Sequence, residues 1–180
     1  MCYIKWGDSM KQLLNQEQLS RILKRMTHEI IERNADLNEI VLVGILRKGY
    51  PIALFLKENL KLFAGVEVEL YPIDITMHRD DNIKKAPVFN NSLNVNGKHV
   101  ILVDDVLYTG RTVRAAMDAL NDFGRPRSIQ LAVLIDRGHR ELPIRADYIG
   151  KNIPTSKNEK VLVDPNEEVV ILIEEIGNDN

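Results

Sequence analysis

Three short apolar runs constrain the fold of this chain more than any other feature. They cover residues 40–43, 100–103 and 129–135 and are rich in Val, Ile and Leu. Strands that are covered on both faces have this composition, because neither face has to meet water. Residues 66–75 are rich in β-branched residues and alternate in polarity, which predicts one further strand. These segments together predict a buried sheet.

Segments with helical spacing separate the strands. Residues 17–33 carry apolar side chains that would share one face of a helix: Leu19, Ile22, Leu23, Met26, Ile30 and Ile31. Residues 50–62 have Pro51 near their start, where proline is tolerated in a first helical turn. Residues 109–123 end before Gly124, a common helix terminator. Strands that alternate with helices predict right-handed βαβ units, and therefore an α/β fold with a central, mostly parallel sheet flanked by helices.

Length and composition predict one domain. The chain has 180 residues, 44% hydrophobic and 28% charged, which suffices for a single core. We expect a domain over residues 16–180 and an N-terminal extension over residues 1–15. No run approaches the roughly 18 apolar residues of a membrane span, and the single cysteine, Cys2, cannot form an internal disulfide. These features predict a soluble, cytoplasmic protein without a membrane partner.

Two segments depart from the α/β pattern. Residues 76–96 are polar and too long for a simple connection, which is typical of functional loops. The chain after residue 158 is acidic, with seven Asp and Glu against one Lys, and residues 169–173 within it could form an edge strand. The net charge of −2 leaves local basic surfaces open.

The segment after the second apolar run carries the chemistry. Asp104 and Asp105 follow this run, and residues 108–112 then turn into a helix. Backbone N–H groups at a helix N-terminus bind phosphate, and Gly110 allows a close approach of the backbone. The two carboxylates can accept hydrogen bonds from neighbouring sugar hydroxyls. The pattern therefore predicts a sugar-phosphate site at the carboxyl edge of the sheet.

Two other sequence motifs are incomplete, because each lacks a residue that its function requires. Gly44 and Gly49 have the spacing of an ATPase P-loop, but Tyr50 stands where lysine is required. Residues 28–32 miss the zincin pattern, because Glu32 stands at the position of its second histidine. A plain helix cap would explain Thr109 but not the paired carboxylates.

Residues 100–112 resemble the phosphoribosyl-diphosphate signature of type I phosphoribosyltransferases. Residues 136–148 extend the likeness to members of this family that combine uracil phosphoribosyltransferase activity with regulation of pyrimidine operons. The resemblance covers residues 17–163 and implies the type I phosphoribosyltransferase fold, with a small hood and a flexible active-site loop. It also implies phosphoribosyl diphosphate and uracil as substrates and UMP as product.

The resemblance implies a role for each segment of the site. Asp104 and Asp105 would hold the ribose hydroxyls. The catalytic set would also include Lys48 and Arg79, which lie on the diphosphate loop and on the flexible loop. The remaining substrate-binding positions would be Arg47, Gly49, Val106, Leu107, Tyr108, Thr109, Gly110, Arg111, Thr112, Arg137, Gly138 and His139.

Catalysis in this family displaces diphosphate at the anomeric carbon, through a transition state that resembles an oxocarbenium ion. Positioning and charge stabilisation would therefore matter more than a covalent nucleophile. Mg²⁺ is the expected cofactor, held by substrate oxygens and water and not directly by the protein. The chain departs from the usual family pattern at Arg47-Lys48 and at His78, and both departures keep or add positive charge.

The regulatory activity implies an RNA surface and a leader-mRNA hairpin as partner. By similarity, the RNA-binding residues would be Arg25, His28, Arg33, His139, Arg140, Arg145 and Lys151. UMP would favour RNA binding and so promote transcription attenuation. The resemblance also implies a homo-oligomer, a dimer or larger. The alternatives are a salvage enzyme without an RNA role, and a transferase that acts on another base such as a purine.

Overall fold

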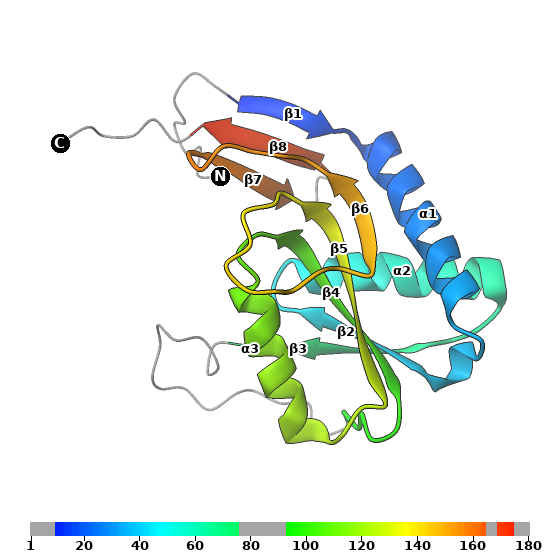
Figure 1. Ribbon diagram of the computed structural model, residues 1–180. Coiled ribbons are helices and arrows are strands. Elements are labelled where there is room, and N and C mark those ends of the chain that lie inside the picture. The colour runs from blue at the N-terminus through cyan, green and yellow to red at the C-terminus, as the bar shows by residue number, and fades with distance from the viewer. Residues whose placement is uncertain (1–9, 76–92, 165–168, 175–180) are drawn as a thin grey trace, which may run out of the picture.

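The computed structural model describes residues 10–75, 93–164 and 169–174, and it contains one large parallel sheet and one small antiparallel sheet (Figure 1). The large sheet has the order β3-β2-β4-β5-β6. Its strands are β2 (Ile40–Ile45), β3 (Glu69–Ile73), β4 (His99–Leu107), β5 (Ser128–Asp136) and β6 (Tyr148–Asn152). All four neighbouring pairs run parallel, as the apolar runs predict.

Helices cover both faces of the large sheet. α1 (Gln16–Arg33) and α2 (Gly49–Ala64) pack on one face, and α3 (Arg111–Leu120) packs on the other (Figure 1). Alternate residues of each strand enter the two cores, so that Leu42 lies with α1 and α2 whereas Val43 lies with α3. The predicted parallel sheet flanked by helices is therefore confirmed. Two short 3₁₀ helices, η1 (Leu37–Glu39) and η2 (Asn121–Phe123), precede β2 and follow α3.

The small sheet has the order β1-β8-β7 and contains β1 (Met10–Leu14), β7 (Glu159–Asp164) and β8 (Val169–Glu174). It lies beyond the carboxyl ends of β5 and β6 (Figure 1). Residues 169–173 lie in a strand, as predicted, but their expected edge position is wrong, because β8 pairs with β1 on one side and β7 on the other. Residues 10–14, expected in the extension, form β1, since β8 supplies their hydrogen-bonding partner.

Element boundaries near the carboxyl edge also differ from the sequence-based ones. β4 does not end at Val103 but runs to Leu107, because its ladder with β5 continues through the pairs Val106–Ile135 and Leu107–Asp136. α3 begins at Arg111 and not at Thr109, since Gly110 has a φ of 92° and cannot be helical. Both shifts place Asp104 and Asp105 inside β4, immediately before the turn.

Candidate phosphoribosyl site and basic face

The two carboxylates of the site lie in different environments. Asp104 is 5% exposed, and its Oδ1 accepts a hydrogen bond of 2.9 Å from the Asp105 backbone N–H. The carboxylate of Asp105 is more open and lies 3.8 Å from the Lys48 Nζ. Lys48 comes from the loop after β2, the strand next to β4, so the parallel order of the sheet brings the two segments together. The predicted ribose-binding and diphosphate-binding residues therefore meet at one edge.

The loop of residues 46–49 approaches β4 closely at Gly49. A Cβ at Gly49 would lie 2.2 Å from the Val103 carbonyl oxygen and 3.0 Å from the Asp104 Cα. The Leu46–Arg47 peptide bond is cis, and the Leu46 N–H donates to the Ile73 carbonyl at 3.0 Å. Arg47 and Lys48 are exposed above this anchored backbone. Only glycine at position 49 lets the loop lie against the strand that carries both aspartates.

The turn at residues 108–112 is held in place by the segment after β5. The Thr109 carbonyl accepts from the N–H groups of Glu141 and Leu142, each at 3.1 Å, and the Thr109 Oγ1 accepts from the Arg111 N–H at 3.4 Å. The Arg111 side chain turns outward and donates to the Glu141 carboxylate at 2.8 Å. The positive φ of Gly110 then allows α3 to begin, with its first N–H groups at the edge of the sheet. A phosphate at this end would meet backbone donors and the positive end of the helix dipole.

Arg137 joins the large sheet to the small one. Its side chain is 7% exposed, and its guanidinium donates to the Thr155 hydroxyl at 2.9 Å and to the carbonyls of Ser156 and Glu159 at 3.1 and 2.7 Å. Its Cζ also lies 4.0 Å from the centre of the Tyr108 ring, a cation–π contact. The Arg137 guanidinium therefore packs against one face of the Tyr108 ring.

The residues after Arg137 form the other wall of the site. Gly138 and His139 both have positive φ, 79° and 58°. A His139 ring nitrogen is hydrogen-bonded to the Thr155 carbonyl at 2.5 Å, and its ring meets Tyr108 edge-on. Thr155 was not among the residues predicted from the sequence, because only these long-range contacts distinguish it from other polar loop residues.

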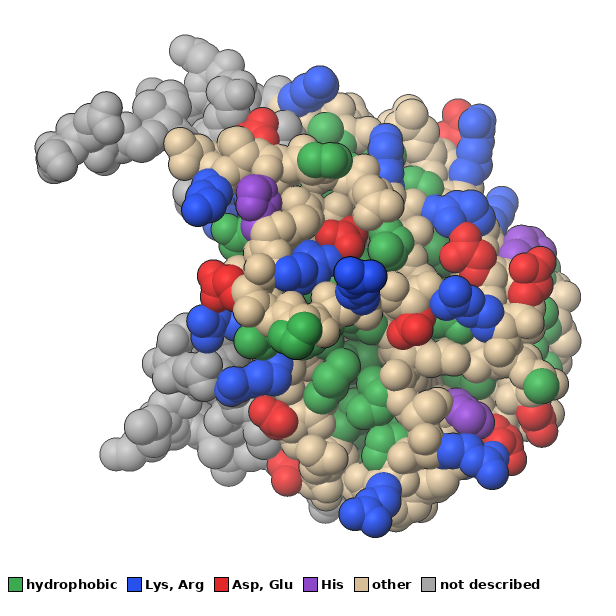
Figure 2. Space-filling model, viewed as in Figure 1, with side chains coloured by type: hydrophobic (Ala, Val, Ile, Leu, Met, Phe, Trp, Pro, Cys, Tyr) green, Lys and Arg blue, Asp and Glu red, His purple; other side chains and the backbone are tan. Residues whose placement is uncertain are grey.

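The expected RNA-binding residues are divided between two places. Arg25 and Arg33 lie on α1 beside β6, and they donate to backbone carbonyls of residues 147–150. His28 stacks on Phe63 of α2, with ring centres 4.7 Å apart. Lys151 and Arg145 are exposed on β6 and on the segment before it. Figure 2 shows Lys and Arg side chains over α1 and over the segment between β5 and β6, with acidic side chains between them.

Arg140 does not share this exposed position. Its guanidinium is hydrogen-bonded to backbone carbonyls and to the Asp136 carboxylate at the edge of the candidate site. The tertiary structure thus separates Arg140 from its exposed neighbour Arg145. Arg79, His78 and the loop that contains them lie outside the described residues, so their role stays a prediction.

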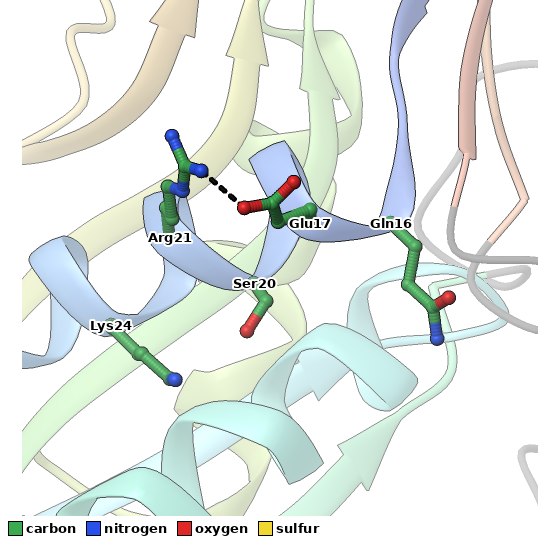
Figure 3. Close-up of a pocket in the computed structure, with 5 residues that line it drawn as sticks. All are labelled: Gln16, Glu17, Ser20, Arg21 and Lys24. Atoms are coloured by element: carbon green, nitrogen blue, oxygen red, sulfur yellow. Dashed lines mark hydrogen bonds and ion pairs between the residues drawn. The ribbon is translucent and has the colours of Figure 1, made fainter.

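A separate hollow lies over the first turns of α1. It is lined by Gln16, Glu17, Ser20, Arg21 and Lys24 (Figure 3). Arg21 is ion-paired with Glu17 one turn earlier, so its charge is partly neutralised within the helix (Figure 3). No residue of the phosphate turn contributes to this hollow.

The residues available to a metal ion are few. Among the described residues, no group of three or more His, Cys, Asp and Glu side chains is arranged to hold a metal. Asp104 and Asp105 are two carboxylates beside the turn that is predicted to bind phosphate, which suits an ion that is ligated mainly by substrate oxygens. In the same part of the chain, no helix is long and apolar enough to cross a membrane.

Comparison with known proteins agrees with this geometry. Residues 9–168 match the family model described as phosphoribosyl transferase domain. A protein named bifunctional protein PyrR from Clostridium perfringens (strain SM101 / Type A) is 55% identical over 156 residues, which cover 84% of this chain and 88% of that protein. Another of the same name from Caldicellulosiruptor bescii is 48% identical over 178 residues, covering 96% and 93%.

Solved structures share the fold at low sequence identity. The hypoxanthine phosphoribosyltransferase of Trypanosoma cruzi has a TM-score of 0.72 and 22% identity, and it matches 91% of this chain and 96% of its own. A hypoxanthine-guanine phosphoribosyltransferase from Bacillus anthracis has a TM-score of 0.69 and 20% identity, with 92% and 99% covered. At this identity the likeness concerns the fold alone.

Proposed function

Because the chain belongs to the phosphoribosyltransferase family, as one of its bifunctional PyrR members, we propose that the site at the end of β4 makes the nucleotide that controls its basic face. The protein is a uracil phosphoribosyltransferase and a regulator of pyrimidine genes. The observation that carries the proposal is the adjacency of the buried Asp104, the turn at residues 108–112 and Lys48.

The described residues support one arrangement of the substrate. The N–H groups of residues 108–112 bind the 5′-phosphate, and the carboxylates of Asp104 and Asp105 accept from the ribose hydroxyls. Arg47 and Lys48 lie on the same edge and attract the diphosphate. The bond from the anomeric carbon to the diphosphate oxygen breaks, the bond from that carbon to a uracil nitrogen forms, and the proton of this nitrogen passes to the departing diphosphate. Positive charge on the sugar then develops beside the two carboxylates, which stabilise it.

A magnesium ion would be held chiefly by the diphosphate oxygens and water, and would supply charge neutralisation for the leaving diphosphate. Asp105 is the carboxylate open enough to contribute a contact. Lys48, at 3.8 Å from Asp105, balances the charge of this carboxylate. The described residues thus form no metal cage of their own.

Recognition of the base depends on the wall of residues 137–139. Arg137 and His139 are both tied to residues 155–159, so their backbone groups are fixed before a base arrives. Such preorganised main-chain donors and acceptors can read the edge of uracil. Tyr108, supported by Arg137, covers the adjacent side.

RNA binding is assigned to the exposed residues Arg25, His28, Arg33, His139, Arg145 and Lys151. Protein contacts to hairpin RNA go to phosphates and to unstacked bases, for which arginine, histidine and lysine are suited. Binding of leader mRNA in the cytoplasm would be favoured by UMP. We also expect a homo-oligomer, since two copies of this modest basic face would extend the RNA footprint.

The enzymatic activity is tested by supplying phosphoribosyl diphosphate and Mg²⁺ with either uracil or hypoxanthine. We expect UMP from uracil and negligible nucleotide from hypoxanthine. Replacing both carboxylates, Asp104→Asn with Asp105→Asn, should lower kcat/KM by about 100-fold or more, because the ribose loses both anchors. Asp118→Asn on the exposed face of α3 makes the same chemical change away from the site and should keep parental kcat/KM. Efficient synthesis by the double variant would refute the site, and a purine nucleotide as main product would refute the substrate.

The regulatory activity is tested with a labelled transcript of the organism's own pyrimidine-gene leader, at one fixed salt concentration. We expect tight binding that strengthens when UMP is added. Arg145→Gln combined with Lys151→Gln should weaken RNA binding with and without UMP, because both side chains are exposed. Weak binding that ignores UMP would leave a salvage enzyme alone.

A further inference from the structure

Thr155 is one of four polar or charged side chains that are buried among the described residues, together with Thr27, Asp104 and Arg137. The hydroxyl of Thr27 has a local partner, because it donates to the Leu23 carbonyl one turn earlier in α1 at 2.8 Å. The partners of Thr155 are distant instead. They lie 18 and 16 residues earlier in the chain, on the wall of residues 137–139.

The side chain of Thr155 orients Arg137. The Arg137 Nε donates to the Thr155 Oγ1 at 2.9 Å, and its Nη2 donates to the carbonyls of Ser156 and Glu159 at 3.1 and 2.7 Å. These three acceptors fix the plane of the rigid guanidinium, whose face then packs on the Tyr108 ring. Two of the acceptors are backbone carbonyls, which any residue would supply. The Thr155 hydroxyl is the acceptor that depends on the amino acid at its position.

The backbone carbonyl of Thr155 holds His139. A carbonyl oxygen can only accept, so the Nε2 of His139 carries the proton in this hydrogen bond. The backbone of His139 has a φ of 58°, and it is the one non-glycine residue with positive φ in the described part of the chain. Such a conformation costs free energy in an L-residue and persists where surrounding contacts hold it. The bond to Thr155 supplies a contact of this kind.

We propose that Thr155 is a positioning residue for recognition of the base. It holds Arg137 and His139, and through them the backbone of residues 137–139, in the arrangement that receives the uracil ring. The inference rests on the proposed function, because it takes this wall as the base site. None of the hydrogen bonds that Thr155 makes within the described residues goes to the two aspartates or to the turn at residues 108–112. Loss of its hydroxyl should therefore affect use of the base more than use of phosphoribosyl diphosphate.

The hydroxyl can be removed with little change of shape, because valine has nearly the outline of threonine. In Thr155→Val the Arg137 Nε loses its acceptor at a buried position, where an unpaired charged donor is unfavourable. The guanidinium must then turn toward another partner, which takes its face off the Tyr108 ring and displaces the backbone next to Gly138. Thr155→Ser keeps the hydroxyl and loses only a methyl group, so it should preserve the arrangement.

The test compares Thr155→Val with Thr155→Ser and with Thr27→Val, the matched loss of a buried threonine hydroxyl in α1. Initial rates of UMP synthesis are measured with varied uracil at saturating phosphoribosyl diphosphate, and then with the two roles exchanged. In Thr155→Val we expect the KM for uracil to rise about tenfold and the KM for phosphoribosyl diphosphate to change by less than about twofold. Thr155→Ser and Thr27→Val should keep both KM values within about twofold of the parent.

Hydrogen exchange at the backbone amides of residues 137–139 provides a measurement that does not depend on activity. We expect faster exchange there in Thr155→Val than in the parent, Thr155→Ser or Thr27→Val, because the wall has lost one of its anchors. Thermal unfolding of each variant shows whether it remains folded. Should Thr155→Val fail to fold, Thr155→Ala removes the same hydroxyl without adding bulk and carries the same expectations.

The outcomes separate the inference from the proposed function. If the KM for uracil stays at the parental value in Thr155→Val, the inference is wrong. It is also wrong if both KM values rise by the same factor, or if Thr27→Val shows the same rise, because the hydroxyl then acts on the whole fold. If the parent uses another base, the proposed substrate fails, and a rise in the KM for that base in Thr155→Val still supports the positioning role. If the parent makes no nucleotide, the proposed function fails, and unchanged exchange at residues 137–139 in Thr155→Val then removes the positioning role as well.

Discussion

At the scale of single residues, Gly49 has the narrowest tolerance in the site. Gly49→Ala would place a methyl group 2.2 Å from the Val103 carbonyl oxygen, so the loop of residues 46–49 must move away from β4. We expect kcat/KM for UMP synthesis to fall by about 100-fold, since small displacements of positioned groups have effects of this size. Steady-state kinetics with varied phosphoribosyl diphosphate would measure the change.

The matched control lies at the other end of the same helix. Gly65 ends α2 with a φ of 68°, and a Cβ there would meet no atom within 4 Å. Gly65→Ala should lower the free energy of unfolding by about 1 kcal/mol, because alanine disfavours positive φ, while kcat/KM stays at the parental value. Equal kinetic effects of the two variants would show that Gly49 acts through stability alone.

At the scale of secondary-structure elements, Arg137 is the link between β5 and the turn before β7. Arg137→Met removes three hydrogen bonds and leaves the carbonyls of Ser156 and Glu159 without this donor. We expect the free energy of unfolding to fall by about 2–4 kcal/mol, with faster hydrogen exchange in residues 155–164. Arg127→Met breaks an exposed ion pair with Glu39 and should change stability by less than about 1 kcal/mol. Slow exchange in residues 155–164 of Arg137→Met would contradict this role.

The packing of α1 against β6 has a pH dependence with a definite sign. Burial raises the pKa of Tyr148, although a hydrogen bond from Asn34 and the nearby charge of Arg33 partly oppose the effect. The folded state therefore favours the neutral phenol, and the stabilisation is complete below the unfolded-state pKa of about 10. Between the two pKa values the native chain retains a proton that the unfolded chain releases. The stabilisation is therefore lost as pH rises through the higher folded-state pKa.

The measurement is the difference in unfolding free energy between the parent and Tyr148→Phe. We expect about 1 kcal/mol in favour of the parent near neutral pH, from the bond that the hydroxyl donates to Gln130 at 2.9 Å. This difference should shrink as the pH is raised from about 9 to about 11. A constant difference over that range would show that the phenol titrates alike in both states.

At the scale of the whole molecule, charge is unevenly distributed although the net charge is only −2. Basic side chains lie over α1 and β6, whereas the chain from β7 onward is acidic. The logarithm of the RNA association constant should therefore fall linearly with the logarithm of salt concentration. Lys151→Gln should make this slope shallower by about one contact, or 0.7–0.9. Lys98→Gln, at the amino end of β4, should leave the slope unchanged, and an equal effect of both variants would mean that RNA senses only overall charge.

The sequence by itself was sufficient for the features that depend on neighbouring residues. Continuous apolar runs predicted β2, β4 and β5, because strands buried on both faces need no polar alternation. The Asp104-Asp105 pair and Gly110 predicted a strand-to-helix turn at the edge of the sheet, since the geometry of such a turn is local, and phosphate binding at this turn stays a prediction. The resemblance carried by residues 100–112 and 136–148 predicted the family.

Tertiary structure decided whatever depends on partners far along the chain. β1 pairs with β8 across more than 150 residues, so neither segment alone showed that it belonged to one sheet. Arg140 and Arg145 are both basic residues of one short segment, and their sequence context does not distinguish them. Only the fold brings the carbonyls of Leu107 and Tyr108 to Arg140 and leaves Arg145 in water. Sequence thus determined which groups the protein has, and long-range hydrogen bonding determined which of them remain available to a partner.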